Sequence, residues 1–181
     1  LAPKGVIVLP LAQVPKVNGY QSASTPLVAG APFDYKVAIT KPEHAAEWAE
    51  AWGRSDDMAI GGLLGIPPCC RRFFARVWKQ ERWMDTTWPM AALTLGEAPS
   101  ASPSIIASGI AIAAPAVNLL WRWHGVRPVS HLPCSFHCTE SLALANKLRT
   151  LMPDEEGAWM DAVLSWPVKY TSLHGIAEIT T

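Results

Sequence analysis

The first 40 residues carry the apolar pattern of two β-strands. A continuous apolar run from Gly5 to Ala12 contains Val-Ile-Val, which is typical of a buried strand. The segment from Asp34 to Thr40 alternates apolar and polar side chains, as a half-buried strand does. Residues 13–32 between them are rich in Pro, Gly, Ser and Ala and are predicted to form a loop.

Most of the remaining chain has the periodicity of helices. Thr40 and Glu43 have the spacing of a capping box, which predicts a helix that ends near Gly53. Further helices are predicted at 55–64, from Pro67 onward, and at 86–95, 105–123, 135–152 and 153–166. Short strands are predicted at 126–132, 168–171 and 176–180. The pattern therefore predicts an α+β fold that is mostly helical, with a small sheet.

Length and composition indicate one globular domain. With 181 residues, half of them apolar and 17% charged, the chain is long enough to bury a core and is not of the disordered class. We therefore expect a single domain over residues 1–181. Because the first residue is Leu1 rather than Met, we also expect the chain to be a fragment or one domain of a longer protein.

Charge and hydropathy argue against nucleic acid or a membrane as partner. The formal net charge is zero, so no global field attracts either. The longest apolar stretch, Ile105 to Trp121, contains Pro115 and is marginal in length for a membrane span, which favours a buried core helix. No secretion signal is visible at the N-terminus, and the cytoplasm is the predicted location.

All four cysteines lie in two short segments with the same local order. In each, an apolar residue is followed by proline, cysteine and a helix-like run: Ile66-Pro67-Pro68-Cys69-Cys70 and Leu132-Pro133-Cys134 up to Cys138. Proline is favoured at the first helical position, so both segments are predicted to be helix N-termini. The backbone N–H groups and the dipole there favour a thiolate. We expect the two segments to meet and form one four-thiol site.

The spacing of the cysteines suggests a metal without identifying it. On a helix, Cys134 and Cys138 would lie one turn apart on one face, which suits two ligands of one metal. Cys69 and Cys70 would diverge by about 100° on a regular helix, which favours a larger object such as an iron–sulfur cluster. Zinc would accept the same thiols, although its structural sites usually show Cys-x-x-Cys. His131 and His137 are alternative ligands.

Other roles for the cysteines stay open at this point. They would be small core residues, since free cysteine is commonly buried, or a disulfide between the two segments. They would also suit a thiol-dependent enzyme, in which Arg71 and Arg72 bind a small anionic substrate beside an activated thiol. In a reducing compartment, clustered cysteines favour metal or redox chemistry over disulfides.

The helix after Pro67 has a further possible use. Basic residues alternate there with Phe73, Phe74, Trp78 and Trp83, a combination that can bind single-stranded nucleic acid or a protein partner. An ordinary amphipathic helix with its aromatic side chains inward explains the pattern better. An interaction module is thus a third hypothesis. No Gly-rich phosphate loop, His-Glu-x-x-His or Gly-x-Ser-x-Gly motif occurs.

The two cysteine segments resemble a family of uncharacterised microbial proteins. That family has a Cys-Cys-x-x-Phe-Phe element followed by Pro-Cys-Ser-x-x-Cys, matched here by Cys69 to Phe74 and by Pro133 to Cys138. The tail from Leu173 to Ile179 is also similar. The resemblance implies no particular activity, but it implies that the four cysteines act as a unit. The sequence thus favours a metal- or iron–sulfur-binding protein.

Overall fold

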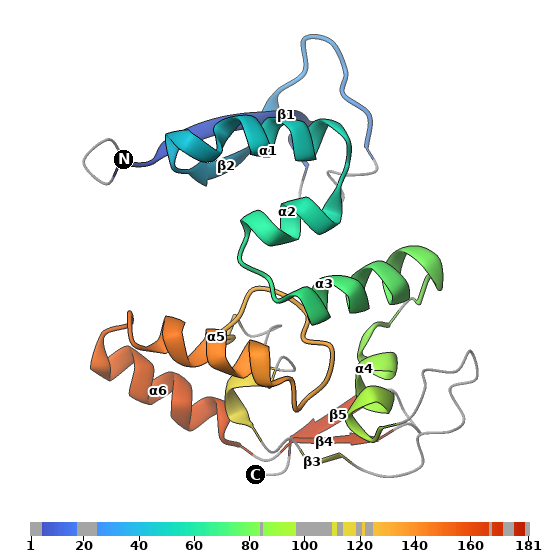
Figure 1. Ribbon diagram of the computed structural model, residues 1–181, viewed down its shortest axis with the longest axis vertical. Coiled ribbons are helices and arrows are strands. Elements are labelled where there is room, and N and C mark those ends of the chain that lie inside the picture. The colour runs from blue at the N-terminus through green and yellow to red at the C-terminus, as the bar shows by residue number, and fades with distance from the viewer. Residues whose placement is uncertain are drawn as a thin grey trace. The chain divides into compact units, whose positions relative to one another are not determined.

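The computed structural model describes residues 5–17, 25–83, 85–96, 110–111, 114–118, 121, 125–166, 168–171 and 176–179 (Figure 1). Contacts divide the chain into two compact units, residues 1–63 and 64–181. Helices predominate and the strands form small antiparallel sheets, which confirms the predicted α+β class. None of the described helices combines the length and apolar character that crossing a membrane requires.

The first unit consists of a hairpin-like pair of strands and two helices. Strand β1 (Ile7–Pro15) pairs antiparallel with β2 (Phe33–Thr40), and its register shifts between Pro10 and Ala12. Proline cannot donate to the ladder and is tolerated at such bulges. The chain continues through a 3₁₀ turn (Pro42–His44) into α1 (Ala45–Gly53) and α2 (Asp57–Leu63). Both predicted strands are confirmed, but β1 is not the buried strand that its apolar run predicted: none of its residues is buried, and Ile7 and Val8 are 36% and 46% exposed.

The two predicted helix starts in this unit have different outcomes. The capping box is wrong: the turn at Pro42–His44 has Lys41 as its N-cap and no side-chain cap hydrogen bond. Thr40 instead ends β2, where it pairs with Ile7 and is buried, so the ladder holds it extended. The helix predicted at 55–64 is confirmed as α2, and Asp56 caps it, because the Ala59 N–H donates to Asp56 Oδ1 at 2.9 Å.

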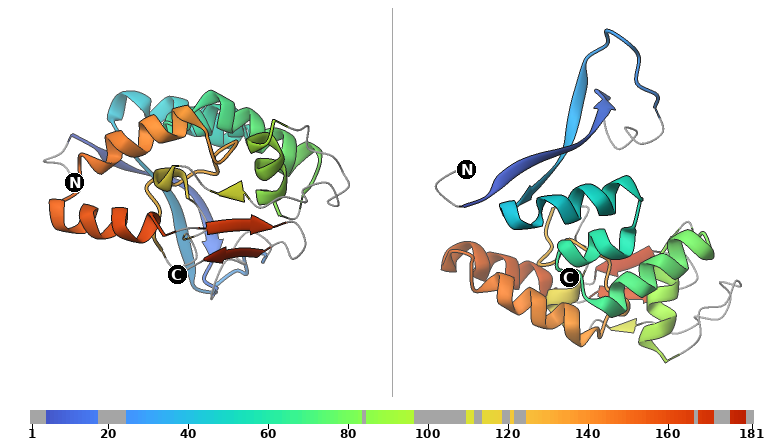
Figure 2. Two further views of the ribbon diagram at one scale, coloured as in Figure 1. Left: turned by 90° about the horizontal axis from the view of Figure 1, so that it is seen from below. Right: turned by 45° about the horizontal axis from the view of Figure 1, so that its top comes forward.

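The second unit contains the remaining helices and a three-stranded sheet. Its strands follow the order β3–β4–β5 and are antiparallel throughout. Figure 2 shows α5 and α6 side by side in this unit. Its elements are α3 (Pro68–Phe74), a π-helical continuation (Ala75–Gln80), α4 (Thr87–Thr94), β3 (Ile110–Ala111), a 3₁₀ turn (Pro115–Val117), α5 (Thr139–Arg149), α6 (Asp154–Leu164), β4 (Val168–Thr171) and β5 (Ile176–Ile179).

Two sequence predictions in this unit are wrong. The apolar helix predicted at 105–123 is replaced, where the structure describes it, by β3 and by the 3₁₀ turn that Pro115 opens. A short buried apolar run fits a strand as well as a helix, and periodicity cannot separate the two. The strand predicted at 126–132 is irregular backbone, although Val126 and Val129 are buried there. The apolar residues are spaced as in a strand because they are buried, although the segment forms no β-ladder.

A hydrophobic core fixes the segment that precedes α5. Phe136 is fully buried and packs with residues of α3, the π-helical continuation and α4. The Phe136 N–H donates to Thr94 Oγ1 at 2.9 Å, and that hydroxyl donates to the Met90 carbonyl at 2.8 Å. Segment 131–138 is therefore held against α4 by packing and by hydrogen bonds. The core consists of Phe73, Val77, Met90, Ala91, Ala92 and Phe136.

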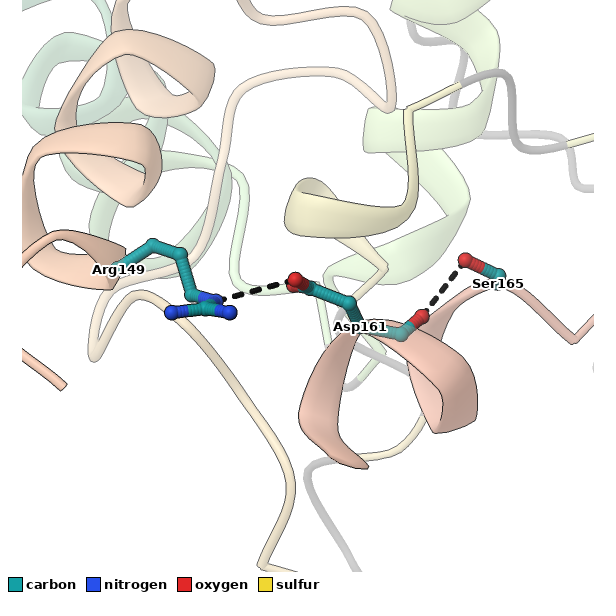
Figure 3. Close-up of polar contacts among 3 residues, drawn as sticks. All are labelled: Arg149, Asp161 and Ser165. Atoms are coloured by element: carbon teal, nitrogen blue, oxygen red, sulfur yellow. Dashed lines mark hydrogen bonds and ion pairs between the residues drawn. The ribbon is translucent and has the colours of Figure 1, made fainter. Parts of the chain in front are cut away.

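An ion pair and a glycine join α5 to α6. Arg149 Nε lies 3.1 Å from Asp161 Oδ2 (Figure 3). The Arg149 guanidinium also passes over Gly157, where a Cβ atom would collide with it. Asp161 is exposed and Arg149 partly exposed, so the pair contributes little free energy by itself. The effect of this contact is on geometry. Because Gly157 has no side chain, Arg149 fits against it and α5 and α6 can meet at this point.

Candidate metal centre

The first pair of cysteines lies in the first turn of α3. Gly65 adopts φ +71°, a conformation that glycine allows without a steric penalty, and turns the chain after α2. Pro67 is the N-cap and Pro68 the first helical residue, where a missing N–H costs nothing. The Arg71 N–H then donates to the Pro67 carbonyl at 3.0 Å. The predicted proline-initiated helix is confirmed, and it carries Cys69 and Cys70 at its start.

The second pair is arranged differently from the prediction. Helix α5 starts only at Thr139, so Cys134 lies in the bent segment before it and not on a helical face with Cys138. Cys138 is the N-cap of α5, and its sulfur accepts the Ser141 N–H at 3.5 Å. The Cys138 N–H donates to the Ser135 carbonyl at 3.3 Å, which closes a turn between the two cysteines. The segment curves where a regular helix was expected.

The four sulfurs converge. Cys138 Sγ lies 3.8 Å from Cys69 Sγ and 3.6 Å from Cys70 Sγ, and the adjacent sulfurs of Cys69 and Cys70 are 3.8 Å apart. All four sulfurs, including that of Cys134, lie within 4.8 Å of one another. The predicted meeting of the two segments is confirmed. The expected divergence of Cys69 and Cys70 does not separate their sulfurs, although both residues lie in a helical turn. The group could hold a metal ion.

The centre is half enclosed. Cys70 and Cys138 are buried, whereas Cys69 and Cys134 are partly exposed. All four are free thiols, so the disulfide alternative is not realised. A soft ligand set that is buried on one side and reachable on the other suits an ion that enters from solvent.

Proton sharing among the thiols separates their pKa values. Contacts with Cys134 and Cys70 lower the pKa of Cys138, so its thiol ionises before those of Cys70 and Cys134. The pKa of Cys134 is raised by its contacts with Cys138 and Cys70 and by burial. For Cys70, the contact with Cys134 lowers the pKa, but the contact with Cys138 and burial outweigh it and raise the pKa to about 12. One thiolate stabilised by neighbouring S–H donors is the expected state of metal-free thiols packed this closely.

A buried serine connects the centre to His131. Ser141 is fully buried, and its Oγ lies 3.2 Å from Cys70 Sγ and 2.8 Å from His131 Nε2. Burial lowers the pKa of His131, although the charge on Cys138 raises it. His131 thus reaches the cysteine centre through the Ser141 hydroxyl. His137 is exposed, and its backbone N–H donates to Ser135 Oγ at 3.3 Å. The close group of possible ligand atoms in the described residues consists of the four cysteines.

The two predicted anion-binding arginines are placed differently. Arg72 lines a cavity next to Cys69 and Cys134, together with Arg76, whereas Arg71 is not among the residues that line it. The sequence prediction counted Arg76 only as part of a basic helix and did not include Ser141 among the site residues. The signal for Ser141 was its position three residues after Cys138, the spacing at which an N-cap side chain accepts a backbone N–H.

Comparisons with protein-family models, with curated proteins and with solved structures found no match for this chain. The resemblance of the cysteine segments to a microbial family therefore stays a prediction.

Proposed function

We propose that this protein binds one Zn²⁺ ion through Cys69, Cys70, Cys134 and Cys138. The observation that carries the proposal is the separation of the sulfurs. Zinc–sulfur bonds of about 2.3 Å in a tetrahedron place the sulfurs about 3.8 Å apart. Three of the separations in the centre are 3.6 to 3.8 Å, and none exceeds 4.8 Å. Small side-chain rotations would bring all four to one ion.

The same separations argue against a cluster. In a four-iron cluster each thiolate binds a different iron atom, so the sulfurs are kept apart by the whole inorganic core. Sulfurs that all lie within 4.8 Å of one another leave no room for that core. Four thiolates and no carboxylate also favour a soft or borderline ion over Mg²⁺ or Ca²⁺. A single zinc ion is therefore preferred to an iron–sulfur cluster.

A four-thiolate set points to a structural role for the ion. Catalytic zinc keeps an open coordination position, whereas four cysteines fill the tetrahedron. Cys70 and Cys138 are 68 residues apart in sequence, so the ion would tie the start of α3 to the start of α5. Four neighbouring thiols attract one another only weakly, and most of the stabilisation at this point of the second unit would come from the metal.

Metal content and cobalt substitution test the proposal. Protein purified anaerobically with added zinc should contain one zinc per chain, with neither iron nor acid-labile sulfide. Cobalt in its place should give the visible absorption of a tetrahedral thiolate site. Cys70→Ser should lose most of that signal because it removes a buried ligand. Iron with labile sulfide would mean a cluster, and protein that takes up no zinc would overturn metal binding altogether.

Ser141 should support the metal without binding it. Its hydroxyl lies 3.2 Å from Cys70 Sγ and is held by His131. Partners that orient ligands in this way typically change metal affinity about 10- to 100-fold. We expect Ser141→Ala to weaken zinc binding by that factor in a competition with a chromophoric chelator.

The matched control is Ser165→Ala. Ser165 is exposed, and its hydroxyl donates to the Asp161 carbonyl at 2.6 Å (Figure 3). This variant should bind zinc like the unaltered protein. Equal zinc affinity in Ser141→Ala and Ser165→Ala would show that the Ser141 hydroxyl has no part in the centre.

A further inference from the structure

A cavity of about 310 Å³ opens beside the cysteine centre. It lies on the side of the two partly exposed cysteines, Cys69 and Cys134. Its volume is at the lower end of the range of small-molecule sites, about 300 to 1,000 Å³. Its walls combine thiols, cations and apolar side chains: Cys69, Arg72, Phe73, Arg76, Leu93 and Cys134.

The two arginines in the wall have unused hydrogen-bond donors. Arg72 is exposed, and its guanidinium makes no hydrogen bond or ion pair with any residue that the structure describes. In Arg76, Nε and Nη2 are buried without a hydrogen-bond partner in the described part of the chain. Its nearest acidic oxygen, on Glu81, is 3.6 Å away, too far for a good hydrogen bond. Buried donors of a cation that lack partners are costly. The exposed guanidinium of Arg72 is open to an anion in the cavity, and Arg76 lines the same wall.

The apolar part of the cavity wall determines what kind of group the ligand can carry besides its charge. Phe73 is buried in the core and lies under Arg76, whose guanidinium carbon is 5.9 Å from the ring centroid. Leu93 also packs against that core. These side chains offer an apolar surface next to the charged one. A guanidinium group is planar and matches the oxygens of a carboxylate or a phosphate in pairs.

The charge of the centre limits the charge of the ligand. Four thiolates and one Zn²⁺ leave two formal negative charges, and Glu81 beside Arg76 adds a third, against the two guanidinium groups. A loaded centre therefore offers directional N–H donors but little net positive field. A small anion of low charge fits this balance, whereas a polyanion would be repelled by the thiolates.

We propose that this cavity binds a small organic anion. Its carboxylate or phosphate group contacts Arg72 and Arg76, and its apolar body packs against Phe73 and Leu93. The site borders the metal centre, since Cys69 and Cys134 line its wall, but the arginines and apolar residues that would hold the anion are not metal ligands. It goes beyond the proposed function, and its test does not depend on which metal the protein holds.

Three probes of similar shape test the proposal: benzoate, phenyl phosphate and the neutral benzamide. They are titrated by calorimetry into the protein as purified, with its metal content measured on the same sample. At least one of the two anions should bind in the millimolar range or tighter, and benzamide at least about tenfold more weakly. The better head group identifies the ligand as a carboxylate or a phosphate. Binding of benzamide equal to that of the anions, or no binding of either anion, would overturn the proposal.

The Arg72→Gln variant tests whether the anion binds in the cavity. Because Arg72 is exposed, this variant should fold, and it should weaken binding of the preferred anion by about tenfold or more. The control is Arg127→Gln, which removes the same charge from an exposed residue that does not line the cavity. An Arg72→Gln variant that binds like Arg127→Gln would place the anion elsewhere. Metal content is read separately, so a missing metal and a missing anion site are distinguishable.

Discussion

Replacing Cys138 with serine should remove the zinc and unfold the second unit at temperatures where the unaltered protein is stable. Structural zinc in small domains contributes about 10–16 kcal/mol of apparent binding free energy at neutral pH. That is comparable with the entire stability of a typical domain, about 5–15 kcal/mol. Thermal unfolding followed by circular dichroism, together with zinc analysis, measures the effect.

The choice of serine separates two roles of Cys138. This residue is both a proposed ligand and the N-cap of α5, with its sulfur accepting the Ser141 N–H. Serine is a strong N-cap, whereas alanine loses about 1 kcal/mol there. If the metal dominates, Cys138→Ser and Cys138→Ala should both lose most of the stability, and a chelator should lower the melting temperature of the unaltered protein alone. If Cys138→Ser were stable and Cys138→Ala unstable, Cys138 would act only as the N-cap of α5 and not as a metal ligand.

The position of the first cysteine pair was predictable because proline marks helix starts. Pro67 and Pro68 fix where α3 begins, and that placed Cys69 and Cys70 in its first turn. Pro133 starts no helix, since α5 begins only at Thr139. The meeting of the two segments was predictable on simpler grounds, because they contain all four thiols of the chain. The strands β1 and β2 were predictable for a similar reason, since continuous apolar runs and strict alternation are short-range signals.

The details of the centre depend on packing that the sequence does not display. Cys134 lies outside α5 because Phe136 is drawn into the core of α3 and α4 and its N–H is bonded to Thr94, which bends the chain there. Helix propensity alone would have continued the helix through this segment. The place of Arg76 in the cavity wall and the partners of Ser141 are likewise set by tertiary contacts. Local pattern indicated which residues matter, and long-range packing determined how they are oriented.

Zinc binding should weaken steeply in acid. Neighbouring thiols lower the pKa of Cys138, which favours its thiolate in the metal-free protein. Cys70 has a pKa raised to about 12, and the pKa of Cys134 is also raised, so both keep their protons at neutral pH. A metal needs thiolates and must displace those protons. Protons therefore compete with zinc, and the zinc affinity falls as the pH falls.

The size of the effect follows from the number of protons released. At least two protons, from Cys70 and Cys134, leave per zinc bound, so the affinity should fall at least about 100-fold for each pH unit below neutrality. Competition with a chelator between pH 6 and 8, corrected for the chelator's own protonation, gives the slope of the logarithm of the zinc affinity against pH. Proton release into a weakly buffered dye solution at pH 7 provides an independent count. A slope of one or less would contradict the pairing of one thiolate with neutral neighbours, because thiols that were already ionised would have no protons to give up.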